Sequence, residues 1–169
     1  LSLNLIKEAL LQTLRLTSMI MWIILGAQVF STAYSAMGAQ QVVMDLMAAI
    51  PGGEWGALAA MLLLLLLMGM VLDPIGIMLI TLPVFMPIIT MYGIDPIWFG
   101  VLFVIMVEIG YMTPPFGFNL FYLRGVAPPS ISIGDIYTSA LPYAAVILFG
   151  LLLIIAFPGI ALWLPKLLF

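Results

Sequence analysis

Two short stretches carry the polar and helix-breaking residues that could do chemistry in this chain. The first is Asp73-Pro74-Ile75-Gly76, in which an aspartate is followed at once by a proline and then by a glycine. The second runs from Glu108 to Asn119 and reads Glu-Ile-Gly-Tyr-Met-Thr-Pro-Pro-Phe-Gly-Phe-Asn. Carboxylate, hydroxyl and backbone carbonyl oxygens suit a hard cation, whereas the N-terminus of a half-helix suits an anionic or polar solute. Both stretches are therefore candidate binding sites.

The composition excludes most other kinds of site. The chain has no histidine and no cysteine, which excludes the usual transition-metal sites, imidazole or thiol catalysis and disulfides. No nucleophile and base can be paired, so an intramembrane enzyme is disfavoured, and no basic stripe suggests nucleic acid as a partner. Of the 169 residues, 66% are hydrophobic and only 7% are charged. Soluble domains are nearer half apolar and a quarter charged, so this is an integral membrane protein.

The elements that carry these stretches are expected to be helices. In lipid every backbone polar group must be satisfied within the protein, which leaves α-helices or a closed barrel. The leucine run at 62–67 and the absence of repeated period-2 segments favour an all-α fold. We predict the following segments: an interfacial amphipathic helix at 1–15, a transmembrane helix and a short interfacial helix at 16–50, two apolar runs at 56–92, an interrupted span at 96–123, a loop at 124–135 and a C-terminal transmembrane helix at 136–165.

The charged residues sort onto two sides of this topology. Three cations fall on one side: Lys7, Arg15 and Arg124. Three acids fall on the other side together with the fourth cation: Asp45, Glu54, Asp95 and Lys166. The positive-inside rule places the first side, and with it the loop at 124–135, in the cytoplasm.

The residues leave two interpretations of segment 56–92 open. In the first, it holds two full spans joined by an ordinary turn at Asp73-Pro74. Its first run of 17 residues would then extend about 25 Å, just short of a hydrocarbon core of about 30 Å. In the second, the segment is a re-entrant hairpin whose tip, near 73–76, lies inside the protein, where irregular backbone is tolerated. Both interpretations give an even number of membrane crossings, so the rest of the topology is the same in either. The residue pattern alone favours two full spans.

The second stretch should unwind its helix at 110–117. Pro114 and Pro115 lack N–H donors and clash with the preceding turn, and they push Thr113 towards extended geometry. The alternative is a simple proline kink. In this register Glu108 lies in mid-membrane, which makes it a functional candidate. The alternative for Glu108 is a protonated or interhelically hydrogen-bonded carboxyl group.

The sequence from Leu72 to Val126 resembles the large membrane subunit of the tripartite ATP-independent periplasmic (TRAP) transporters. Three segments carry the resemblance: Leu-Asp-Pro-Ile-Gly-Ile-Met-Leu-Ile-Thr-Leu-Pro-Val-Phe-Met-Pro at 72–87, Gly-Ile-Asp-Pro at 93–96, and Gly-Tyr-Met-Thr-Pro-Pro-Phe-Gly-Phe-Asn-Leu-Phe at 110–121. The last is similar to the family signature G-x-x-T-P-P-x-G-x-N-L-F. The flanks agree more loosely with the last third of the family's sequence, so the likeness spans nearly the whole chain.

The resemblance implies a sodium-driven secondary importer of small organic acids such as dicarboxylates, not an enzyme, in a bacterial or archaeal cytoplasmic membrane. Its large subunit has two inverted repeats, each with a re-entrant hairpin and an unwound helix, and works by an elevator mechanism. This chain resembles the C-terminal repeat, as a fragment or as part of a longer subunit. The resemblance therefore favours the hairpin, with its tip at 73–76. The implied partners are the first repeat of the same subunit, the small membrane subunit, the periplasmic substrate-binding protein and the lipid bilayer.

Inverted-repeat logic then assigns the site residues, with the hairpin tip facing the unwound stretch. The implied sodium-binding residues are Asp73, Pro74, Gly76, Gly110, Met112 and Thr113. The implied substrate-binding residues are Thr113, Pro114, Gly117 and Asn119. Glu108 is a candidate coupling carboxylate, although many family members carry an uncharged residue there. Sodium would be the coupling ion, with no transition metal and no covalently bound cofactor. The alternative function is a structural membrane piece for subunit assembly that has no complete transport site.

Overall fold

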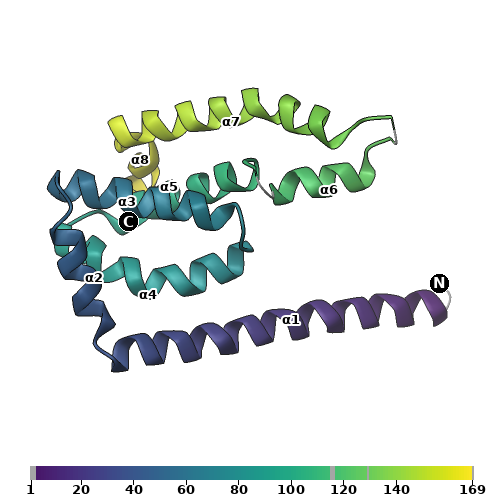
Figure 1. Cartoon of the computed structure of the whole chain (residues 1–169), viewed down its shortest axis with the longest axis horizontal. Helices are drawn as coiled ribbons and strands as arrows, with labels where there is room; N and C mark the ends of the chain where they lie inside the picture. The colour runs from purple at the N-terminus through teal and green to yellow at the C-terminus, as the bar shows by residue number, and fades with distance from the viewer. Residues whose placement is uncertain (1–2, 115–116, 129, 169) are drawn as a thin grey trace.

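The computed structural model describes residues 3–114, 117–128 and 130–168, and every regular element within them is an α-helix (Figure 1). The helices are α1 (Leu3–Ala36), α2 (Ala39–Ala48), α3 (Gly53–Gly69), α4 (Pro74–Tyr92), α5 (Pro96–Tyr111), α6 (Phe118–Val126), α7 (Ile133–Ala156) and α8 (Gly159–Leu168). Among the described residues, α1, α4 and α7 are long and apolar enough to cross a membrane, and the bent pair α2–α3 makes a fourth candidate. The predicted all-α membrane class is confirmed.

Helix α1 is continuous where two segments were expected. It runs for 34 residues from Leu3 to Ala36, a length of about 50 Å, and it has no break at residue 15. The reason is local, because the sequence here holds strong helix formers such as leucine, methionine and glutamine and has no proline. Its described side chains are exposed over the first half, and only Ala27 and Tyr34 are buried. Where the membrane interface crosses this helix stays a prediction.

Two glycine-containing turns redirect the chain between α1 and α3. Gly38, with a positive φ of 66°, starts α2, and Gly52, with a φ of 99°, starts α3. Only glycine adopts this left-handed region at little cost. Helices α2 and α3 are bent by 119° relative to each other. The short helix expected after the first span is therefore present as α2, and its interfacial position stays a prediction.

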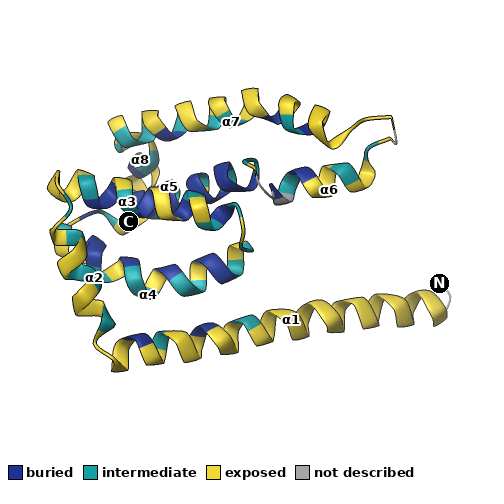
Figure 2. Cartoon of the chain, viewed as in Figure 1, coloured by how far each residue is buried: buried dark blue, intermediate teal, exposed yellow. Residues whose placement is uncertain are grey.

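The core lies between α3, α4 and α5, which run side by side (Figure 1). Its fully buried side chains include Leu65 of α3, Ile77 and Phe85 of α4, and Leu102 of α5. Figure 2 shows burial concentrated on these helices, whereas α1 and most of α7 are exposed. Their exposed residues include large apolar ones such as Trp22 and Phe149. A large exposed apolar surface is what a lipid-facing protein requires.

Helices α3 and α5 run parallel to each other along their whole length. Near their N-terminal ends, the rings of Trp55 and Trp98 meet edge to face with their centroids 6.5 Å apart. Near their C-terminal ends, the backbones of Gly69 and Gly110 are in close contact. The two helices therefore end at the same place in the protein.

The C-terminal region is divided where a single helix was expected at 136–165. Helix α7 stops at Ala156 and α8 begins at Gly159. Pro158 has no N–H and disfavours helical geometry in the residue before it, so Phe157 takes φ −130° and ψ 76°. Pro142 is tolerated inside α7. At the other end, α7 begins in a capping box in which Ser132 and Asp135 bond to each other's backbone N–H.

Candidate functional site

The first predicted stretch is the turn between α3 and α4 together with the start of α4. Asp73 is the N-cap of α4, and its Oδ1 accepts a hydrogen bond from the Gly76 N–H at 2.9 Å. Pro74 occupies the first helical position, where its missing N–H costs nothing. The irregular backbone covers 70–73, so the residues expected at a hairpin tip, 73–76, are the cap and first turn of α4. The depth of this turn in the membrane stays a prediction.

The second predicted stretch is a true interruption between α5 and α6. Helix α5 ends at Tyr111, and α6 begins at Phe118. The Thr113 hydroxyl closes the end of α5 by donating to the Ile109 carbonyl at 2.6 Å. Gly117, with a φ of 59° and a ψ of 66°, starts α6 in the left-handed region. Of the two prolines predicted to break the helix, Pro114 is exposed, and Pro115 lies outside the described residues.

The two stretches meet at a contact between glycines. A Cβ added to Gly110 would lie 2.8 Å from the Gly69 Cα and 2.9 Å from the Leu66 carbonyl oxygen. Only glycine allows two helix backbones to approach so closely. The adjacent Tyr111 is buried. Because Asp73 follows Gly69 by only four residues, the contact brings the first stretch close to the end of α5, which begins the second.

The two helix ends that meet here are both C-termini. Gly69 is the last residue of α3, and Gly110 is the last but one of α5. Each helix C-terminus carries a partial negative charge. Several of the last carbonyls accept from the N–H groups that follow, as Met68 does from Leu72 and Gly110 from Thr113. Together with the Asp73 carboxylate, this arrangement is electrostatically suited to a cation.

Glu108 and Asn119 are joined across the interruption. The Asn119 Nδ2 donates to the Glu108 Oε1 at 2.6 Å, and both side chains are half-buried. They border a groove of about 390 Å³ between α5, α6 and α7. The groove is lined by Glu108, Met112, Asn119, Leu120, Leu123, Ile136, Ser139, Ala140 and Tyr143. Met112, predicted near sodium, therefore lines this groove, and Gly117 packs towards Leu120 and Tyr137.

Sequence reasoning missed two residues of this region, Gly69 and Tyr111. Gly69 ends the leucine-rich run, and a glycine in a helix costs stability unless its small size is needed. That cost is the signal that could have found it. Tyr111 lies inside the recognised motif, but only the packing shows that its side chain is buried.

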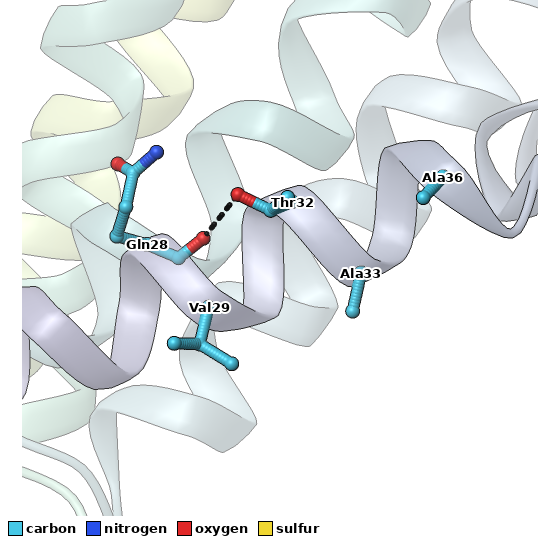
Figure 3. Close-up of a pocket in the computed structure, with 5 residues that line it drawn as sticks. All are labelled: Gln28, Val29, Thr32, Ala33 and Ala36. Atoms are coloured by element: carbon cyan, nitrogen blue, oxygen red, sulfur yellow. Dashed lines mark hydrogen bonds between the residues drawn. The ribbon is translucent and has the colours of Figure 1, made fainter.

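A second groove, on α1, is not a candidate site. It holds about 350 Å³ and is lined by Gln28, Val29, Thr32, Ala33 and Ala36 (Figure 3). All five residues come from one helix, and the Thr32 hydroxyl donates to the Gln28 carbonyl at 2.8 Å. The hydroxyl is thereby satisfied within its own helix. This groove is a shallow surface of α1 and is far from the interrupted helices in the sequence.

Fold and site together define an all-α, multi-pass membrane protein whose helices are interrupted where they meet. A family model described as "Tripartite ATP-independent periplasmic transporter, DctM component" matches residues 1–160. The chain therefore belongs to the DctM family of tripartite ATP-independent periplasmic transporters, which confirms the resemblance seen in its motifs. The members of this family are permease subunits of the cytoplasmic membrane and not enzymes.

Individual relatives agree with the family assignment. The chain is 34% identical over 162 residues to the C4-dicarboxylate TRAP transporter large permease protein DctM of Vibrio cholerae, covering 96% of this chain and 35% of the relative. It is 33% identical over 150 residues to the 2,3-diketo-L-gulonate TRAP transporter large permease protein YiaN of Escherichia coli, covering 89% of this chain and 35% of the relative. The sialic acid TRAP transporter large permease protein SiaM of Vibrio cholerae is 28% identical over 160 residues, covering 95% of this chain and 37% of the relative. The chain thus spans about a third of these relatives' length.

Proposed function

We propose that this chain is part of a sodium-coupled secondary transporter that imports a small organic acid. The observation that carries the proposal is the Gly69–Gly110 contact, because it brings two helix C-termini together in the region of the turn that carries Asp73. Family membership supports transport, and the names of the relatives supply the substrate class, since dicarboxylate, diketogulonate and sialic acid are all organic acids.

Sodium is proposed to bind where α3 and α5 end. Oxygen ligands would come from Asp73, from the backbone of Pro74 and Gly76, and from Gly110, Met112 and Thr113. A hard cation prefers such oxygens, and the partial negative charges of both helix ends favour it. The partial positive charge at the start of α4 does not oppose a cation here, because the Asp73 carboxylate caps that start.

The solute is proposed to bind on the other side of the interruption. Helix α6 starts after Gly117, and the N–H groups of a helix start suit the carboxylate of an organic acid. Thr113, Pro114, Gly117 and Asn119 are the residues proposed to face it. The rest of the pocket would come from the first repeat of the same subunit, related by inverted symmetry, and the two repeats would move as an elevator. The small membrane subunit and a periplasmic binding protein would complete the transporter.

Sodium coupling is tested by uptake into proteoliposomes that contain the full-length large subunit and its small membrane subunit, with the binding protein added outside. Radiolabelled C4-dicarboxylate, 2,3-diketo-L-gulonate and sialic acid are offered in turn. We expect uptake of one class when sodium is present outside and none when choline replaces sodium at equal ionic strength. Uptake that is unchanged in choline would contradict the sodium coupling.

The alternative function, a structural piece that only assembles with partners, makes a different prediction. Thr113→Ala removes the hydroxyl that closes α5, whereas Thr113→Ser retains it. If the interrupted helix is part of the transport site, the alanine variant should assemble normally and lose uptake, and the serine variant should transport. Normal assembly and normal uptake in both variants would favour the alternative.

A further inference from the structure

The hydrogen bond between Glu108 and Asn119 exists only because the helix is interrupted. The two residues are 11 positions apart in the sequence, and their side-chain atoms are 2.6 Å apart. In an unbroken helix, 11 residues span about 16 Å along the axis. The bond therefore depends on the angle between α5 and α6, and it can hold that angle fixed.

We propose that Glu108 is a positioning residue, which holds the start of α6 against the end of α5 through Asn119 and so sets the geometry of the proposed transport site. The inference rests on the proposed function. Glu108 lies one turn before the end of α5, and Asn119 is the second residue of α6. The bond thus spans the segment that carries Thr113, which belongs to both the proposed sodium site and the proposed solute site, and Pro114, which belongs to the solute site.

The strength of this bond follows from its surroundings. A site of low dielectric strengthens a hydrogen bond relative to water, and leaving its partners unpaired there is costly. Apolar side chains of α6 and α7 pack beside the pair, where Leu120, Ile136 and Ala140 form a small buried cluster. The pair therefore lies where α5, α6 and α7 come together, and a change in the bond would move α6 against both neighbours.

The bond also changes what Asn119 can do. The Asn119 amide has two hydrogens on Nδ2, and Nδ2 is the donor of the bond to Glu108. One of its amide hydrogens is thereby committed to Glu108. Asn119 then acts first by fixing the start of α6, rather than by holding the solute with that N–H group, as the resemblance alone suggested.

The test uses the full-length subunit in its complex, with uptake of the radiolabelled solute class that the wild type transports. Glu108→Gln keeps an accepting oxygen of the same shape, whereas Glu108→Met keeps the length and removes the acceptor. Asn119→Ala removes the bond from the other side without touching the carboxylate. We expect E108Q to stay within about twofold of the wild type. E108M and N119A should each raise the KM for the solute by about tenfold, with a smaller effect on the maximal rate.

The double variant E108M/N119A decides whether the two residues act as a unit. If they do, its KM equals that of the single variants, because one bond can be lost only once. Multiplied effects of about a hundredfold, or an E108Q variant as impaired as E108M, would overturn the proposal. Thr138→Ala, which removes a hydroxyl that donates to the Gly134 carbonyl within α7, should leave the KM unchanged.

A second measurement is independent of transport. Hydrogen–deuterium exchange of the purified complex should show faster exchange at residues 111–120 in E108M and N119A and wild-type exchange in E108Q. Unchanged exchange in N119A would overturn the proposal even if uptake fell. If the wild type takes up solute without sodium, the proposed coupling fails, and the exchange result still decides the role of the pair.

Discussion

Replacing Gly110 with alanine is expected to destabilise the protein by about 3 kcal/mol, the upper end of the usual range for overpacking. The added methyl group would lie 2.8 Å from the Gly69 Cα and 2.9 Å from the Leu66 carbonyl oxygen. Both are backbone atoms of α3 that no side-chain rotation can move away. Helices α3 and α5 must therefore separate, and the proposed sodium site at their ends opens. We expect sodium-dependent uptake to fall by tenfold or more.

The matched control lies in the same helix. Gly100 is also a glycine of α5, and apart from the adjoining backbone of its own helix no atom lies within 4 Å of the position that its Cβ would take. Gly100→Ala should therefore be neutral or stabilise α5, because alanine favours a helix over glycine by about 1 kcal/mol. Thermal unfolding of the purified complex and uptake in proteoliposomes are measured for both variants. Equal behaviour of G110A and G100A would show that the backbone contact carries no function.

The interruptions could be predicted from sequence because their causes are local. Asp73 followed by Pro74 is a helix start whatever packs around it. The pair Pro114-Pro115, with Gly117 close behind, cannot continue a helix. The same reasoning failed at the C-terminal end of α7, because prolines are often tolerated in membrane helices. Pro142 stays inside its helix while Pro158 ends one, and the sequence around each is similarly apolar.

The contacts between helices could not be predicted, because the sequence holds little information about which face points inward. Helices α3 and α5 are apolar on all sides, so no polar face marks the outside. The Gly69–Gly110 contact therefore follows from packing alone. The Glu108–Asn119 bond is of the same kind, since its existence depends on the direction in which α6 leaves the interruption. The sequence indicated Glu108 and Asn119 as candidate functional residues, but it could not show that they bond to each other.

Replacing Asp73 with serine is expected to separate its two roles. Serine caps a helix about as well as aspartate, so the start of α4 should keep its stability to within about 1 kcal/mol. The variant loses the carboxylate beside the C-termini of α3 and α5. If Asp73 binds sodium, the half-saturating sodium concentration for uptake should rise by about ten- to hundredfold, the usual effect of weakening a metal site. Uptake is measured against sodium at constant ionic strength, with choline as the balancing cation.

Asp95 provides the matched control, because it starts α5 in the same way that Asp73 starts α4. Its Oδ1 accepts from the N–H groups of Ile97 and Trp98 at 2.8 and 3.1 Å, and Pro96 follows it at the first helical position. It lies at the opposite end of α5 from Gly110, so its carboxylate is far from the proposed ion site. Asp95→Ser should therefore leave the sodium dependence unchanged. If Asp73→Ser also leaves it unchanged, Asp73 is a helix cap and the cation must be held by the helix ends alone.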